Sequence, residues 1–258
     1  MAKQVGVFPI EGTLDNITFL KTKDGYIVKK KTVISAERIA SDPAFARTRE
    51  NNAEFGRAGK EGKLLRSSIA PLLKGVADHR MVSRLHKSMI AVQQADTINV
   101  RGARTVTDGD LSLVTGFDFN VNGKLSTIFS APYTTNTNRA TGVLDVNVPA
   151  FTPSQLITAP TGATHFKLVM GGAGLDFAGK TYVNGVDEST VLPLGNTATA
   201  PIALTVSVTA GSSLSLFIVL GIKFYQEVNG LQYALNDGSG DAVSVVAVAA
   251  YWANGPMR

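Results

Sequence analysis

Residues 214–235 read LSLFIVLGIKFYQEV-NG-LQYAL, two strand-like runs on either side of an Asn-Gly pair. Such a pair supplies the positive φ angles that a tight hairpin needs, so the stretch predicts antiparallel strands over 214–228 and 231–235. Six of the chain's seven Asn-Gly or Asp-Gly pairs lie after residue 104, and between them we expect further strands over 116–121, 142–148, 165–170, 202–209 and 242–252. Short strands at this spacing, with no long helical pattern between them, predict an antiparallel β-sandwich over residues 105–258.

In the residues before the strands, the apolar positions no longer alternate; they recur every three or four residues, as they do in helices. Ile69, Leu72, Leu73 and Val76 fall at i, i+3, i+4 and i+7, and a second apolar stripe follows at residues 82, 85, 89 and 92. This spacing is typical of amphipathic helices in a bundle. We therefore expect about three helices within a basic helical region, residues 35–104.

The first 34 residues contain a predicted hairpin preceded by an arm. Alternating runs, ITFLKTK and YIVKKK, flank Asp24-Gly25, which predicts a lysine-rich β-hairpin. The arm before it, residues 1–16, has too few apolar residues to form a core and must pack on a surface or stay loose. The predicted fold class is thus α+β: arm and hairpin, a short helical bundle, then an antiparallel β-sandwich.

Charge divides the chain as sharply as the periodicity does. Residues 1–104 carry 19 of the 25 Lys and Arg residues and 10 of the 20 Asp and Glu residues. Residues 105–258 carry the remaining 6 basic and 10 acidic residues. The basic and the acidic part can attract one another in head-to-tail contacts between copies, which generate rings or filaments.

The last predicted strand is apolar on both of its expected faces. Strict alternation places Val245 and Tyr251 on one face and Val246 and Trp252 on the other. Two explanations fit: a central sandwich strand partly covered by the helical region, or a strand buried by a second subunit. Because monomers rarely expose large apolar patches, we favour the first.

Motifs that carry chemistry are few. The chain has no Cys, which excludes thiolate metal sites and a Cys nucleophile. His79 and His86 lack the i, i+4 spacing of a zinc helix, and His165 has no nucleophile motif near it. Residues 171–174, GGAG, follow a strand but lead into no helix, so we expect a turn or bulge and not a phosphate loop. We predict no catalytic residues, no metal site and no cofactor, and hence no enzyme.

The one positive constellation is basic. Arg80, Arg84 and Lys87 fall at i, i+4 and i+7, which predicts a stripe on one helix face, and six more basic residues lie between 47 and 66. Such a face can bind the phosphates of a nucleic acid without recognising its base sequence. It also suits an acidic neighbouring copy, or it is simply solvated.

The N-terminus, MAKQVGVFPIEG, has no apolar core of a Sec signal peptide, and no uninterrupted apolar run reaches about 18 residues. We therefore expect cytoplasmic synthesis and no membrane span. Export by another route stays open, so an extracellular or particle-associated final location is compatible with the sequence.

The run from Asp24-Gly25-Tyr26 to RENNAEFGRAGK at residues 49–60 resembles a family of uncharacterised proteins from Bacteroidota genomes. The resemblance covers about the first 100 residues best. It implies no catalytic or binding residues.

We carry three hypotheses of function. The first is a structural subunit that self-assembles into a filament, ring or shell through its arm and its sandwich. Its candidate assembly residues are Val5, Val7, Phe8, Ile10, Tyr251 and Trp252. The second is a nucleic-acid-associated protein that uses the basic helices, and the third is a β-sandwich that binds glycans or another surface. The first explains the arm and the last strand, which phosphate binding leaves unexplained.

Overall fold

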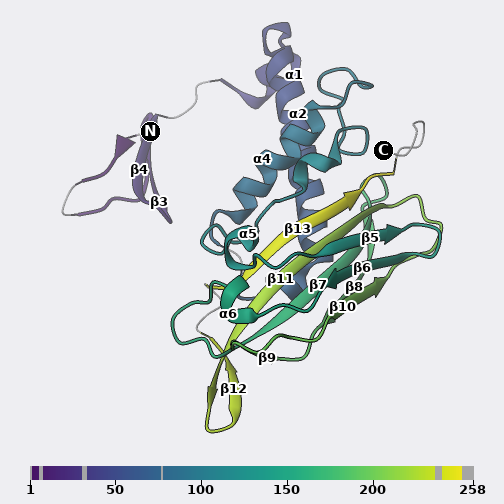
Figure 1. Ribbon diagram of the computed structural model, residues 1–258. Coiled ribbons are helices and arrows are strands. Elements are labelled where there is room, and N and C mark those ends of the chain that lie inside the picture. The colour runs from purple at the N-terminus through teal and green to yellow at the C-terminus, as the bar shows by residue number, and fades with distance from the viewer. Residues whose placement is uncertain (1, 6–7, 31–33, 77, 236–239, 252–258) are drawn as a thin grey trace. The chain divides into compact units, whose positions relative to one another are not determined.

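The computed structural model describes residues 2–5, 8–30, 34–76, 78–235 and 240–251. The chain forms two compact units, residues 1–51 and residues 52–258. The α+β fold with antiparallel sheets that the sequence predicts is confirmed (Figure 1). The predicted boundary near residue 104 lies inside the second unit, because residues 52–104 share an apolar core with the strands.

The first unit contains a four-stranded antiparallel sheet of order β1-β4-β3-β2. Its strands are β1 (Ala2–Lys3), β2 (Gly12–Leu14), β3 (Ile17–Thr22) and β4 (Gly25–Lys30). The predicted hairpin is β3 and β4, and Gly25 has the positive φ, +111°, that the turn requires. Parts of the arm add a strand to each side of the hairpin, because β1 pairs with β4 and β2 pairs with β3.

Helices follow the sheet. They are α1 (Ala36–Ser41), the 3₁₀ turn η1 (Pro43–Phe45), α2 (Ala46–Ser68), α3 (Ala70–Leu73) and α4 (Met81–Gln94). Ser35 caps α1 by accepting a hydrogen bond from the Arg38 N–H, and Asp42 caps η1 in the same way. The second unit adds a 3₁₀ turn and two single-turn helices: η2 (Leu111–Val114), α5 (Leu125–Ile128) and α6 (Pro153–Leu156).

Two antiparallel sheets form the sandwich of the second unit. The six-stranded sheet has the order β12-β11-β7-β8, with β13 pairing with β11 and β9 with β7. The three-stranded sheet has the order β10-β6-β5. The strands are β5 (Thr134–Asn138), β6 (Val143–Val148), β7 (His165–Asp176), β8 (Thr181–Glu188), β9 (Leu192–Pro193), β10 (Ile202–Ser207), β11 (Ser215–Val228), β12 (Leu231–Ala234) and β13 (Ala242–Ala249).

The six-stranded sheet is the middle of three layers, with α2, α3 and α4 on one face and the three-stranded sheet, α5 and α6 on the other (Figure 1). Alternate residues of β11 enter two different cores: Leu216, Ile218 and Leu220 pack toward the three-stranded sheet. Phe217 and Val219 pack toward the helices, with Leu65, Leu85 and Met89. This explains why β7 and β11 are apolar at nearly every position.

Residues 171–174 correct one prediction, because they form neither a turn nor a bulge. They continue β7 in regular register with β11, Gly172 opposite Ile218. A Cβ on Gly172 would lie 2.6 Å from Val206 Cγ1, and one on Gly171 would lie 3.0 Å from Leu72 Cδ2. Glycine therefore lets the other two layers approach the sheet closely on both faces.

β13 packs against its own chain on both faces, with residues 242–245 buried and residues 246–249 half-buried. Ile218 pairs with Ala247 and Val219 with Val245, so Val246 is an extra residue that forms a β-bulge. After the bulge the faces exchange: Val245 and Val248 lie on the helix side, whereas Val246 and Ala247 lie on the sandwich side. The strict alternation expected over 242–252 is therefore wrong beyond Val245. The expected strand over 116–121 is not a regular element among the described residues. The segment nevertheless runs along β13, with backbone hydrogen bonds from the Gly116 N–H to the Val245 carbonyl oxygen and from the Phe119 N–H to the Val243 carbonyl oxygen, and with an isolated antiparallel bridge between Asp118 and Ser244.

Candidate functional site

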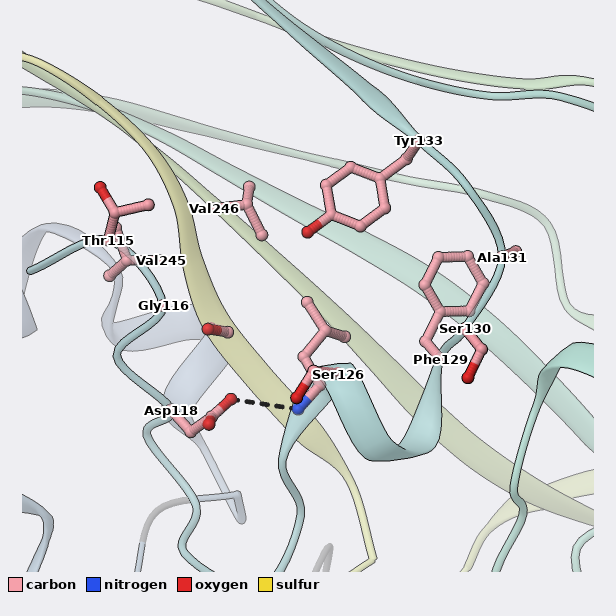
Figure 2. Close-up of a pocket in the computed structure, with 12 residues that line it drawn as sticks. Thr115, Gly116, Asp118, Ser126, Phe129, Ser130, Ala131, Tyr133, Val245 and Val246 are labelled. Carbon is pink, nitrogen blue, oxygen red and sulfur yellow. Dashed lines mark hydrogen bonds between the residues drawn. The ribbon is translucent and has the colours of Figure 1, made fainter.

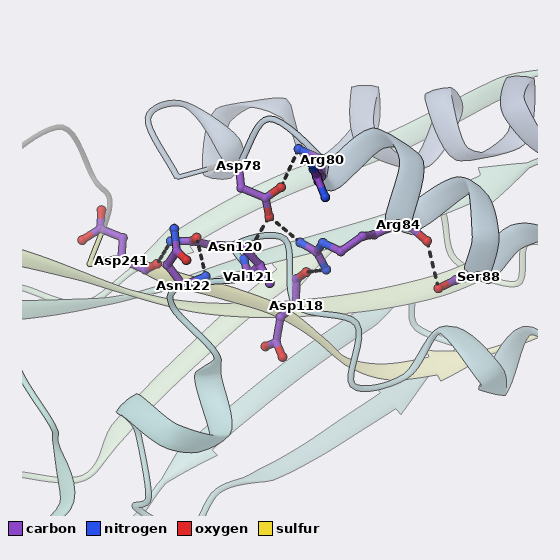
Figure 3. A network of polar contacts seen from close by, with 9 residues as sticks. All are labelled: Asp78, Arg80, Arg84, Ser88, Asp118, Asn120, Val121, Asn122 and Asp241. Carbon is purple, nitrogen blue, oxygen red and sulfur yellow. Dashed lines mark hydrogen bonds and ion pairs between the residues drawn. The ribbon is translucent and has the colours of Figure 1, made fainter. Parts of the chain in front are cut away.

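The three residues of the predicted basic stripe have different surroundings, and Figure 3 shows two of them, Arg80 and Arg84. Arg80 and Lys87 are exposed, but Arg84 is half-buried and bound within its own chain. Its Nη1 donates to the Asp118 carbonyl oxygen at 2.8 Å, and its guanidinium lies over the Phe117 ring at 5.1 Å. Arg84 therefore holds the segment after η2 against α4, and it is not part of a free cationic face.

Asp78 is the centre of this network and was not singled out from the sequence. Its carboxylate accepts hydrogen bonds from Arg84 Nη2 at 2.6 Å, from the Arg80 N–H at 2.7 Å and from the Val121 N–H at 2.9 Å. Burial alone would raise the pKa of Asp78, but these hydrogen bonds outweigh it and lower the pKa. The only sequence signal is an Asp two residues before an Arg at a helix start.

The network continues to the start of β13 (Figure 3). Asn120, which is buried, donates from Nδ2 to the Asp241 carbonyl oxygen at 2.9 Å and accepts from the Asn122 N–H at 3.0 Å. The Asp241 carboxylate accepts from the Phe224 N–H at 3.0 Å, and burial raises its pKa to about 6. These contacts fix loops and strand ends, which is a structural role.

The histidines belong to separate parts of the second unit, and two of them, His86 and His165, contact groups nearby. His86 Nε2 lies 2.9 Å from the Phe55 carbonyl oxygen, and its ring packs on the Phe55 ring. His165 Nε2 lies 3.3 Å from Glu227 Oε2. His79 is exposed at the start of α4. Within the described residues, no group of three or more His, Asp or Glu side chains could hold a metal ion.

A pocket of about 370 Å³ lies between the segment after η2, α5 and β13 (Figure 2). Its lining includes Asp118, Ser126 and Tyr133, and Figure 2 shows the Tyr133 hydroxyl directed into it. Asp118 Oδ1 accepts from the Leu125 N–H at 3.1 Å, which orients the carboxylate. Burial and the charge of Asp118 raise the pKa of Tyr133. The lining holds hydroxyl groups but no histidine, so its serines have no adjacent imidazole base.

The candidate assembly residues also divide. Val5, Phe8 and Ile10 are 93%, 85% and 56% exposed, whereas Val7 and Trp252 lie outside the described residues. Tyr251 is 37% exposed, and its ring lies 5.5 Å from the Arg139 guanidinium. Tyr251 is thus engaged by its own chain, and the N-terminal residues are the ones that stand unpacked.

In the described part of the chain, no helix combines the length and the apolar character that crossing a membrane requires. Comparisons of the chain with protein-family models, with curated proteins and with solved structures found no match.

Proposed function

We propose that this protein is a non-enzymatic structural subunit that self-assembles into a filament, ring or shell through its N-terminal sheet and its β-sandwich. The carrying observation is the state of the first unit: none of its described residues is buried. Apolar side chains are nonetheless present on it, and six large ones are exposed: Val5, Phe8, Ile10, Leu14, Ile17 and Ile34. A sheet with exposed apolar groups and no core of its own fits a surface that another subunit covers.

The energetics favour a second surface for this sheet. Burying three or four of these side chains contributes about 5–10 kcal/mol, at about 1.5–3 kcal/mol for each. Ordering a dozen residues costs about 1–2 kcal/mol each, about 12–24 kcal/mol in all, which exceeds that gain. Strands β1 and β2 lie at the two edges of the sheet, where backbone pairing with a strand of another subunit can supply the difference.

The distribution of charge supports an assembly of unlike surfaces. The basic residues concentrate before residue 105, and the part after it carries 10 acidic against 6 basic residues. A contact between the basic part of one copy and the acidic part of the next is head-to-tail, and such contacts close into rings or continue as filaments.

The test is sedimentation velocity of the full chain at low and high salt, over a range of protein concentrations. Self-association is expected. Deletion of residues 2–12, or the substitution Phe8→Ser, should raise the dissociation constant at least tenfold. Each change removes apolar side-chain surface whose burial contributes about 1.5–3 kcal/mol or more to the free energy of association. Val100→Ser, which changes a 77% exposed valine of the second unit, is the matched control. A full chain that stays monomeric at high concentration would refute the proposal, and a monomer that shifts only with added DNA would favour the nucleic-acid alternative.

The pocket of Figure 2 favours glycan binding as a second candidate function. Hydroxyls, the Asp118 carboxylate and the Phe129–Tyr133 pair, whose rings stack with centroids 6.3 Å apart, are groups that hold sugar hydroxyls and ring faces. Binding to an immobilised glycan panel that is lost in Tyr133→Ala and kept in Tyr182→Ala would support it. Equal binding by both variants would count against it.

A further inference from the structure

A second hollow of the sandwich unit lies between α2 and the turn that joins β7 to β8. Two adjoining cavities of about 650 Å³ and about 430 Å³ share five lining residues: Arg57, Lys60, Glu61, Phe177 and Lys180. Volumes of this size are typical of sites for small organic ligands. We call this hollow the α2 cleft. It is distinct from the pocket of Figure 2, with which it shares no lining residue.

The charge of the α2 cleft is strongly positive. Lys60, Lys63 and Lys180 line it, and among the described residues none of the three forms an ion pair. Arg57 is already committed, because its guanidinium donates to the carbonyl oxygens of Arg104 and Gly102. Arg57 thus forms part of the cleft wall, and the three lysines supply positive charge that no described ion pair neutralises.

The acidic groups of the cleft offset only part of this charge. Asp108 accepts hydrogen bonds from Asn99 Nδ2 and Thr105 Oγ1, both at 2.8 Å, within its own loop. Glu61 is only 7% exposed, and its Oε2 has no hydrogen-bond partner among the described residues. Burial raises the pKa of Glu61 to about 7, so that near neutral pH a large part of this carboxyl is uncharged.

The cleft also has an apolar side. Phe177 is 7% exposed and makes an edge-to-face contact with Phe217, with ring centroids 6.3 Å apart. Leu64 and the 41% exposed Tyr182 add to the apolar lining. The turn that carries Lys180 is held by a hydrogen bond from the Gly179 N–H to Asp176 Oδ1 at 2.8 Å. A ligand that fits must therefore bring both negative charge and apolar surface.

We infer that the α2 cleft binds a small organic anion, a carboxylate, sulfonate or phosphate carried on an apolar or aromatic body. The lysines receive the anionic group, and Phe177, Leu64 and Tyr182 contact the body. Because the site lies within the second unit, it stands independently of the proposed assembly through the N-terminal sheet.

The experiment uses the full chain and the dye 8-anilinonaphthalene-1-sulfonate, an aromatic anion whose fluorescence rises on binding. Saturable binding is expected, and the double variant Lys60→Gln, Lys180→Gln should weaken it about tenfold or more, as loss of charge-assisted contacts requires. Lys87→Gln, on exposed α4 surface, is the matched control and should bind as the wild type does. Circular dichroism of each variant checks that the fold is kept.

Exposed apolar side chains of the first unit also attract such a dye, so the difference between the wild type and the double variant measures the cleft. Equal binding by the two proteins overturns the inference. Laurate should displace the dye from the wild type, whereas inorganic phosphate at the same concentration should not. Displacement by phosphate as effective as that by laurate would overturn the requirement for an apolar body.

Discussion

Arg84 and Asp78 form the closest ion pair of the network that joins α4 to the segment after η2, with Arg84 Nη2 2.6 Å from Asp78 Oδ2. The Asp78 side chain is only 6% exposed, and the other Arg84 nitrogen donates to the main chain of Asp118. An ion pair in this position stabilises the fold more than a surface pair does, because water cannot fully take over the hydrogen bonds of either partner when the pair is broken.

Replacing Arg84 should therefore destabilise the monomer. We expect Arg84→Met to lower the free energy of unfolding by about 2–3 kcal/mol, since it removes the charged partner of the buried Asp78 side chain and the Arg84 hydrogen bond to the Asp118 carbonyl oxygen. Lys87→Met, one turn further along the same helix but exposed, should change it by less than about 0.5 kcal/mol. Urea unfolding followed by circular dichroism measures both, and equal effects would show that the Arg84 contacts are not formed in solution.

The raised pKa of Glu61 predicts that an uncharged replacement stabilises the protein more at high pH than at low pH. Its pKa is raised by burial from the ordinary 4.5 to about 7, although the Val106 N–H and the Arg57 charge both favour the ionised form. The folded state thus binds the proton more tightly than the unfolded state. Ionisation of Glu61 therefore lowers the stability of the folded state. This loss is absent below about pH 4.5, grows between pH 4.5 and pH 7, and is complete above pH 7.

We expect the stability of Glu61→Gln relative to the wild type to rise by about 2 kcal/mol between pH 5 and pH 8. This difference does not depend on any fixed cost of placing an amide at the site. Glu11→Gln, at an exposed position, is the control and should show no such trend. Urea titrations at pH 5, 6, 7 and 8 give the result, and parallel curves for Glu61→Gln and the wild type would contradict the assignment.

The glycines of β7 give a prediction on packing. A Cβ at Gly172 would lie 2.6 Å from Val206 Cγ1 and 2.9 Å from Leu144 Cδ1, so Gly172→Ala should cost about 1–3 kcal/mol of stability. Gly56, in α2, has nothing within 4 Å of its ideal Cβ, and Gly56→Ala should stabilise by about 0.5–1 kcal/mol. Thermal unfolding of the two variants should therefore shift in opposite directions. A neutral Gly172→Ala would mean that the two sheets are packed less closely than described.

These same residues show what the sequence can and cannot predict. The Asn-Gly and Asp-Gly pairs predict turns from local φ requirements, and Asn229 and Gly230 do have positive φ angles, +53° and +77°. The GGAG run was misread because glycine marks both turns and close approach, and only the neighbouring layers distinguish the two. The bulge at Val246 is equally invisible, since one extra residue in a uniformly apolar strand leaves no local signal.

The candidate sites, too, could be predicted from the sequence only in part. Helical spacing correctly places Arg80, Arg84 and Lys87 at the start of α4 and within it, yet it cannot reveal that Asp78 and Asp118 take up the middle residue. The α2 cleft was out of reach for another reason: Lys60 and Lys180 lie 120 positions apart in sequence and meet only because β7 ends beside α2. Long-range pairing of this kind is set by topology, which local patterns do not carry.

Arg139 ties three distant segments together at one end of the sandwich. It follows β5, and its Nη1 donates to the Ser212 carbonyl oxygen at 2.9 Å, while its Nη2 donates to the Ala249 carbonyl oxygen at 2.9 Å. The guanidinium also lies against the Tyr251 ring. Lysine carries the same charge, but its compact ammonium lacks the planar fork by which a guanidinium spans carbonyl oxygens on separate segments and lies flat on a ring.

Arg139→Lys should therefore lower the free energy of unfolding by about 1–3 kcal/mol although the net charge is unchanged, because half-buried carbonyl oxygens lose the hydrogen bonds that the guanidinium donates. Arg66→Lys is the matched control, since no described hydrogen bond or ion pair uses the Arg66 side chain, and a change below about 0.5 kcal/mol is expected. Urea unfolding supplies the energies, and amide hydrogen exchange at Tyr251 should quicken only in Arg139→Lys. If Arg139→Lys matches the control in both measurements, the guanidinium does not hold the end of β13, and Tyr251 becomes available again as an assembly residue.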